Sequence, residues 1–107
     1  MLKENDQARL FTCLGEPTRL QILKLLAQSE MCVKDMVKNL KVEQSLVSYH
    51  LRLLRDCNII LARNDAQRTF YRLSDPRLAQ LVLISEALVK DISICPRKGF
   101  MPNFRKC

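Results

Sequence analysis

Cysteine side chains are the most reactive groups in this sequence, and thiolates suit soft metal ions and oxidants. The chain of 107 residues contains five of them: Cys13, Cys32, Cys57, Cys95 and Cys107. No two cysteines are separated by only two residues, so the spacing gives no zinc-ribbon or thioredoxin motif. Because their number is odd, the cysteines cannot all pair within one chain.

The compartment decides whether these cysteines are thiols or disulfides. Residues 1–7 are polar and have no signal-peptide core. No apolar run approaches the roughly 18 residues that a membrane span needs. We therefore expect a cytoplasmic protein that does not enter a membrane, with cysteines that are thiols rather than disulfides.

A second group of chemically useful side chains gathers between residues 44 and 55. Its members can hydrogen-bond to bases or neutralise phosphates: Gln44, Ser45, Ser48, Tyr49, His50, Arg52 and Arg55. Glutamine can bond adenine through two hydrogen bonds, and serine can donate to bases or phosphates. The net charge of +7 and the pI of about 9.5 also favour a polyanionic partner. The alternative is a solvated polar helix face, with His50 packed against its neighbours.

Apolar residues at helical spacing predict four helices, of which the fourth contains this polar group. They cover residues 8–14, 17–27, 32–40 and 43–57. Asn58, which tolerates the left-handed conformation, is expected to end the fourth helix. A hairpin follows, with strands at 59–63 and 68–73 around a turn at 64–67. Ser74, Asp75 and Pro76 then open a last helix that extends to residue 92.

This order of elements predicts a mainly α fold with a β-hairpin wing, in the order α-α-α-α-β-β-α. The short third helix, the tight link and the longer fourth helix form a helix-turn-helix. Its second helix would lie in the major groove of double-stranded DNA, with its first residues at the base edges. Arg63 and Arg68 flank the hairpin turn and are expected to reach a minor groove or phosphates.

One domain is expected over residues 1–94, followed by a loose basic tail over residues 95–107. The last helix has an apolar stripe that so small a domain cannot cover fully. We expect a second copy to cover it, giving a homodimer through the first and last helices. A two-fold dimer would hold two recognition helices roughly 34 Å apart and would bind a palindromic operator.

An enzyme is not expected. The chain has only 2 glycines and no glycine-rich phosphate loop. Its single histidine, His50, has no cysteine or serine partner at motif spacing. The remaining alternative to a DNA-binding regulator is a protein-interaction module that kept the winged fold.

Three segments in order resemble the ArsR/SmtB family of metal-responsive repressors. They are Leu14-Gly-Glu-Pro-Thr-Arg-Leu-Gln-Ile-Leu23, Val42-Glu-Gln-Ser-Leu-Val-Ser-Tyr-His-Leu-Arg-Leu-Leu54 and Phe70-Tyr-Arg-Leu-Ser-Asp-Pro76, and the resemblance covers about residues 8–92. It implies a homodimeric winged helix-turn-helix that represses a metal-resistance or other stress operon. An inducer would bind and release the operator. Glu43 and Asn58 depart from the family's usual Ser and Gly.

The resemblance leaves the inducer open. Arsenic- and cadmium-sensing members carry Cys-Val-Cys-Asp where this chain has Cys32-Val33-Lys34-Asp35, so the second thiolate is absent. Zinc sensing through the last helix needs histidines, and His50 is the only one. Persulfide-sensing members pair a second-helix cysteine with one near the end of the last helix; Cys95 matches the second position, but Lys24 occupies the first.

Trivalent arsenic or antimony takes three thiolates, and other thiophilic metals also accept sulfur. We expect Cys32, Cys95 and Cys107 to bind As(III) or Sb(III), or another such ion. Cys13 and Cys57 are expected to pack in the core. The alternatives are a redox- or persulfide-sensing repressor and a winged-helix regulator with no thiol sensor.

Overall fold

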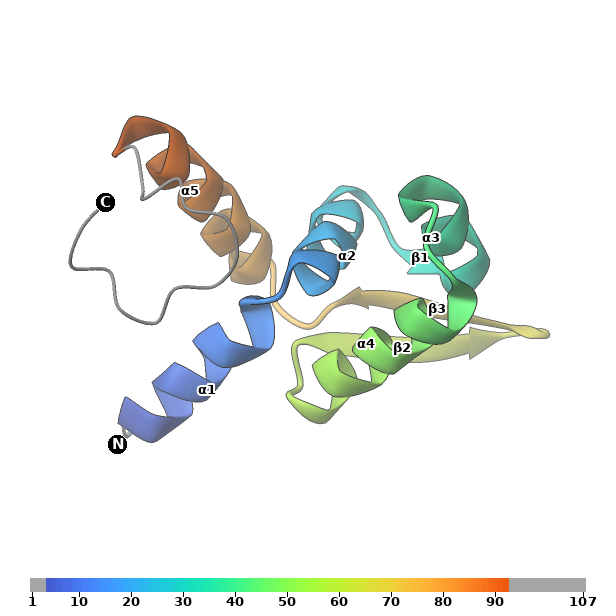
Figure 1. Cartoon of the computed structure of the whole chain (residues 1–107). Helices are drawn as coiled ribbons and strands as arrows, with labels where there is room; N and C mark the ends of the chain where they lie inside the picture. Colours follow the sequence, from blue (N-terminus) through green and yellow to red (C-terminus); the bar gives the residue numbers. More distant parts are fainter. Residues whose placement is uncertain (1–3, 93–107) are drawn as a thin grey trace.

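The computed structural model describes residues 4–92 and contains five helices and three strands. Figure 1 shows the helices in two groups, with the hairpin reaching away from α1 and α5. The elements are α1 (Glu4–Leu14), α2 (Pro17–Gln28), β1 (Met31–Cys32), α3 (Val33–Leu40), α4 (Gln44–Asp56), β2 (Ile60–Asp65), β3 (Arg68–Leu73) and α5 (Arg77–Asp91). The predicted order of helices and hairpin is therefore confirmed. The tail over residues 95–107, with Cys95 and Cys107, lies outside the described residues.

Local residue chemistry explains where these helices begin and end. At the start of α2 the Glu16 carboxylate accepts a hydrogen bond from the backbone N–H of Arg19 at 2.9 Å, and Pro17 occupies the first turn. Helix α3 ends at Lys41, which takes the left-handed conformation with φ of 55°. Asn58 follows α4 with φ of 60°, as its residue type predicted.

The sheet contains one strand that the sequence did not predict. Strands β2 and β3 pair antiparallel from Ile60 opposite Leu73 to Asp65 opposite Arg68. The short β1 adds to the other side of β3, with Cys32 opposite Phe70, so the strand order is β1-β3-β2. Two residues are too few for an alternating pattern to be visible in a sequence. Cys32 therefore belongs to this strand and precedes α3 instead of beginning it.

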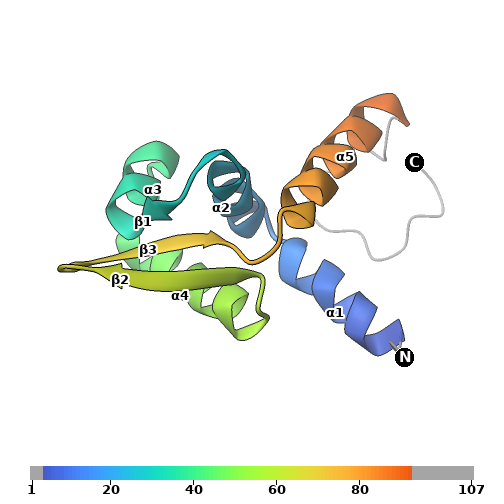
Figure 2. The ribbon, with the colours of Figure 1, turned by 180° about the vertical axis from the view of Figure 1, so that it is seen from behind.

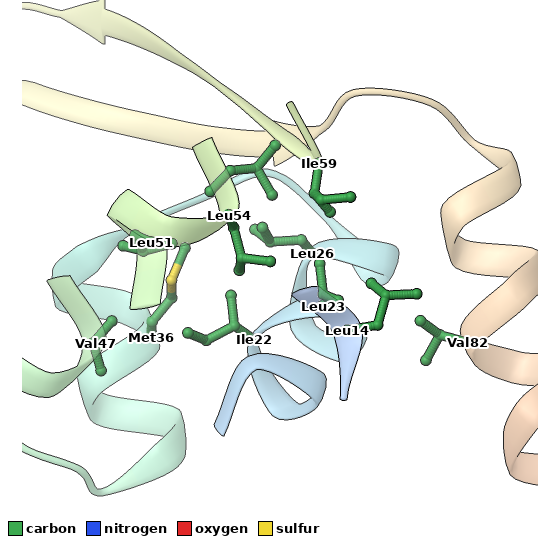
Figure 3. Close-up of a cluster of buried hydrophobic side chains, with 11 residues drawn as sticks. Leu14, Ile22, Leu23, Leu26, Met36, Val47, Leu51, Leu54, Ile59 and Val82 are labelled. Carbon is green, nitrogen blue, oxygen red and sulfur yellow. The ribbon is translucent and has the colours of Figure 1, made fainter. Parts of the chain in front are cut away.

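One apolar core holds the helix-turn-helix against the rest of the domain. Figure 3 shows side chains from α2, α3 and α4 meeting there, with Ile59 above them and Val82 of α5 at one side. Ile22, Met36 and Leu54 are fully buried. Because α4 contributes several of these side chains, its inner face is fixed and its outer face is left to solvent.

Helices α1 and α5 leave large apolar side chains exposed. Figure 2 shows both helices at the end of the molecule opposite the hairpin tip. Their exposed apolar residues are Phe11, Leu83, Ile84, Leu88, Val89 and Ile92, each about half exposed or more. Across residues 4–92, no helix combines the length and apolar character that crossing a membrane requires.

Candidate DNA-binding surface

The outer face of α4 carries the polar residues that the sequence singled out. Gln44, Ser45, Ser48 and Tyr49 are all exposed in the first two turns of the helix. Val47 is fully buried between them and fixes which face turns outward. The structure thus brings four predicted contact residues onto one free surface at the start of the second helix of the helix-turn-helix. Arg52 extends this surface one turn further and is also exposed.

The structure corrects the expectation for His50. Its side chain is only 5% exposed and faces inward, so its imidazole is not available on the outer surface of α4. Arg19 Nη1 lies 3.2 Å from His50 Nδ1, and the Glu16 carboxylate lies 3.8 Å from Nε2. Since arginine can only donate, His50 Nδ1 is the acceptor in the contact with Arg19. This geometry makes His50 a residue that positions the helix.

Arg19 connects the recognition helix to the end of α1. Besides its contact with His50, its Nε donates to the carbonyl oxygen of Cys13 at 2.7 Å. Its Nη2 donates to the carbonyl oxygen of Thr12 at 3.4 Å. These carbonyls belong to the last turn of α1, where backbone acceptors have no partner within the helix. This role of Arg19 was not predicted, because its partners Cys13 and His50 lie on other helices.

The two arginines of the wing differ in their surroundings. Arg63 makes a paired contact with Glu30, with Nη2–Oε1 at 2.7 Å and Nε–Oε2 at 2.9 Å. Its guanidinium also lies 4.9 Å from the centre of the Phe70 ring. The hydrogen bonds from Arg63 lower the pKa of the Glu30 carboxyl. Arg63 therefore links β2 to Glu30, the residue directly before β1, through this ion pair.

Arg68 lies at the tip of the wing and is exposed. No acidic group within residues 4–92 forms an ion pair with it. Together with Lys34 and Lys38 of α3 it lines a hollow of about 450 Å³. Asp35 is the one acidic residue among the residues that line this hollow. The hollow therefore has three cations that could contact a DNA phosphate. The two lysines were not predicted as phosphate contacts from the sequence.

The predicted cysteine ligands do not meet in the described part of the chain. Cys32 is a buried free thiol, 4% exposed, whose Sγ donates to the Asp35 carboxylate at 3.3 Å. Within residues 4–92 no three cysteine, histidine or acidic side chains gather closely enough to hold a metal ion. The predicted partners Cys95 and Cys107 lie outside this range.

Two other cysteines are joined instead. Cys13 of α1 forms a disulfide with Cys57, the residue that caps the C-terminus of α4, and their Cα atoms are 7.0 Å apart. This bond corrects two expectations, that all cysteines are thiols and that this pair only fills the core. A separation of 44 residues left no local signal in the sequence.

The fold and the exposed polar helix define a winged helix-turn-helix regulator of transcription. The family profile "Bacterial regulatory protein, arsR family" matches residues 16–61. A probable mercury resistance operon repressor of Streptomyces lividans is 37% identical over 84 residues, which are 78% of this chain and 67% of that protein. The chain belongs to the ArsR/SmtB family of transcriptional repressors. The relatives named here are described as regulators of transcription.

Solved structures support the same assignment. HlyU from Vibrio cholerae N16961 matches with a TM-score of 0.75 and 29% identity, over 85% of this chain and 100% of that chain. The homodimeric winged helix-turn-helix domain of Mb0332 from Mycobacterium bovis, described as a possible ArsR-family transcriptional regulator, matches with a TM-score of 0.75 and 25% identity, over 89% of each chain. Both agree with the winged helix-turn-helix predicted from the order of elements.

Proposed function

We propose that this repressor binds a palindromic operator as a homodimer and that a thiol-reactive inducer releases it. The observation that carries the proposal is the outer face of α4, where Gln44, Ser45, Ser48 and Tyr49 are exposed together. These side chains are the proposed base contacts. The core holds the inner face of the same helix, so the contacts are presented on a rigid element.

Positive charges beside this helix would fix the register of the complex on the DNA backbone. Arg52 on α4 and Arg68 at the wing tip are exposed and are the proposed phosphate contacts. Arg63 is already paired with Glu30, so its proposed contact with the DNA backbone is weaker. His50 acts through the position of α4.

The exposed apolar faces of α1 and α5 are the proposed dimer interface. Phe11 is 54% exposed and Ile84 is 58% exposed, which is costly for an isolated domain. The homodimeric state of the Mb0332 domain supports this arrangement. A two-fold axis near these helices would place the two recognition helices about one turn of DNA apart, roughly 34 Å.

A thiophilic metal ion is the first proposed inducer, and the mercury resistance repressor among the relatives supports this class. As(III) or Sb(III) would need Cys32, Cys95 and Cys107 together. Cys32 would first have to leave its buried hydrogen bond to Asp35. The second candidate is a redox- or persulfide-sensing repressor, which the Cys13–Cys57 bond favours.

The test is a titration by fluorescence anisotropy with DNA from upstream of the protein's own gene. Reduced protein is titrated first, and then arsenite, antimonite, cadmium, zinc, mercury(II) and a persulfide donor are added singly. Tight, salt-sensitive binding that one soft thiophile releases is the expected result. Weak binding that is insensitive to salt would instead support a winged-helix module that does not act on DNA.

A further inference from the structure

The Cys13–Cys57 disulfide joins helix α1 to the C-terminal end of helix α4. Cys57 caps the C-terminus of the recognition helix α4, and Cys13 lies in α1, whose Phe11 belongs to the proposed dimer face. Helix α1 otherwise packs mainly on α2. The bond is therefore a covalent connection between the helix proposed to read DNA and a helix proposed to hold the dimer.

A second connection joins the same two helices through Arg19 of α2, and it reaches α4 at a different residue from the bond. Arg19 donates to the Cys13 carbonyl oxygen at 2.7 Å and contacts His50 Nδ1 at 3.2 Å. The end of α1 is thus held to the middle of α4 by hydrogen bonds and to the end of α4 by the sulfur bridge. The two attachments share Cys13 on α1 but hold α4 at two places about two helical turns apart, so together they fix the direction of α4 relative to the end of α1.

The two cysteines border a hollow that small reagents can enter. Both cysteines are partly exposed and line a hollow of about 210 Å³ together with Asp6 and Arg9. Arg9 brings a cation to the hollow, which favours thiolates, and Asp6 opposes it. Cys32 contrasts with this pair, since it is buried and bonded to Asp35.

We propose that Cys13 and Cys57 form a reversible oxidative modification site that switches operator binding, an inference that rests on the proposed function. Hydroperoxides are the proposed oxidant class. One thiolate attacks the hydroperoxide, the O–O bond breaks, and a sulfenic acid and an alcohol form. The second thiolate displaces water from that sulfur and closes the disulfide. In total, two thiols and one hydroperoxide give one disulfide, one alcohol and one water, and a dithiol reductant reverses the change.

The switch acts on the recognition helix. In the reduced protein the sulfur bridge is absent while the hydrogen bonds of Arg19 to Cys13 and His50 remain, so the C-terminal end of α4 can adjust to the DNA. Closing the bond fixes that end to the dimer helix and removes the adjustment. Operator affinity is therefore expected to fall by about tenfold or more on oxidation, within the usual range of coupling between two sites.

The experiment uses the full chain and has two separate readouts. Reduced wild-type protein is treated with tert-butyl hydroperoxide, and its disulfides are mapped by peptide mass spectrometry with and without dithiothreitol. Operator affinity is measured by anisotropy on the same samples. The variants are C13S and C57S, with C13A and C57A as second choices if a serine variant fails to fold. The matched control is the double variant C95S/C107S.

The expected result is a Cys13–Cys57 disulfide that forms and is reduced again, with an affinity loss in the wild type and in C95S/C107S but none in C13S or C57S. Oxidation that maps to another pair, or an affinity loss that persists in C13S and C57S, would overturn the inference. So would a mapped Cys13–Cys57 bond that leaves the affinity unchanged. Failure of the reduced wild type to bind DNA is a separate outcome, which would overturn the proposed function and with it the switch.

Discussion

Replacing Arg19 by alanine is the most informative perturbation of this domain. The substitution removes hydrogen bonds from one guanidinium to the Cys13 carbonyl at 2.7 Å, to the Thr12 carbonyl at 3.4 Å and to His50 Nδ1 at 3.2 Å. It also leaves the buried His50 without this partner. The variant therefore lacks the hydrogen bonds through which Arg19 connects the end of α1 to the recognition helix α4.

The expected magnitude follows from these contacts. A hydrogen bond from a charged donor contributes about 1.5–3 kcal/mol, and a long one contributes less. The contact with the Thr12 carbonyl is long and exposed, so we count only the other two, and both are partly buried. With a discount for solvent screening, the free energy of unfolding is expected to fall by about 2–4 kcal/mol.

The assay is urea unfolding followed by circular dichroism, at one protein concentration because a dimer's stability depends on it. The midpoint is expected to shift by about 1–3 M urea. The variant R19K keeps the positive charge but cannot make all three contacts. Its urea midpoint should lie between those of the wild type and R19A. The control R77A removes an exposed guanidinium paired with Asp75 and should shift the midpoint much less.

Operator affinity provides the second readout for the same variants. It is expected to fall in R19A at temperatures where the variant remains folded, because the first two turns of α4, which carry the proposed base contacts, are no longer positioned through His50. A shift in R19A no larger than that in R77A would refute the stability argument. Unchanged operator affinity in folded R19A would refute the claim that Arg19 positions the recognition helix.

Four further predictions concern the wing, the dimer face, the core and one carboxylate. In R68A, operator affinity should fall for all DNA sequences alike, and the slope of log K against log salt should decrease in magnitude by about one; a loss confined to one sequence would contradict a phosphate contact. In I84E, a charge enters the exposed apolar face of α5, so analytical ultracentrifugation should find monomer; an unchanged mass would place the interface elsewhere. In L54A, the fully buried side chain leaves a cavity, and the free energy of unfolding should fall by about 2–5 kcal/mol in urea titrations, with a cost below about 1 kcal/mol contradicting its place in the core. Hydrogen bonds from Arg77 lower the pKa of Asp75 from 3.8 to about 2, so its contribution to stability is present above pH 4 and is lost as the pH falls toward 2; D75N should flatten the pH dependence in that range, and an unchanged profile would contradict the pairing.

Much of the fold could be predicted because its signals are local. The helical spacing of apolar residues defined the helix-turn-helix, and Asn58 marked the end of its second helix. The same spacing placed Ser48 and Tyr49 on the outer face of α4, since buried positions recur every three or four residues. These features depend on residues within about one or two turns of each other.

The sequence by itself thus determined the order of the elements and the polar face proposed to read DNA. Tertiary structure decided which side chains meet across long separations. It buried His50 beneath Arg19, 31 residues away, and paired Arg63 with Glu30, 33 residues away. It also brought Cys13 to Cys57, 44 residues away. Periodicity records which face of a helix is buried, but a partner on another element is chosen only when the elements pack, and for that reason the thiol pair could not be found in the sequence alone.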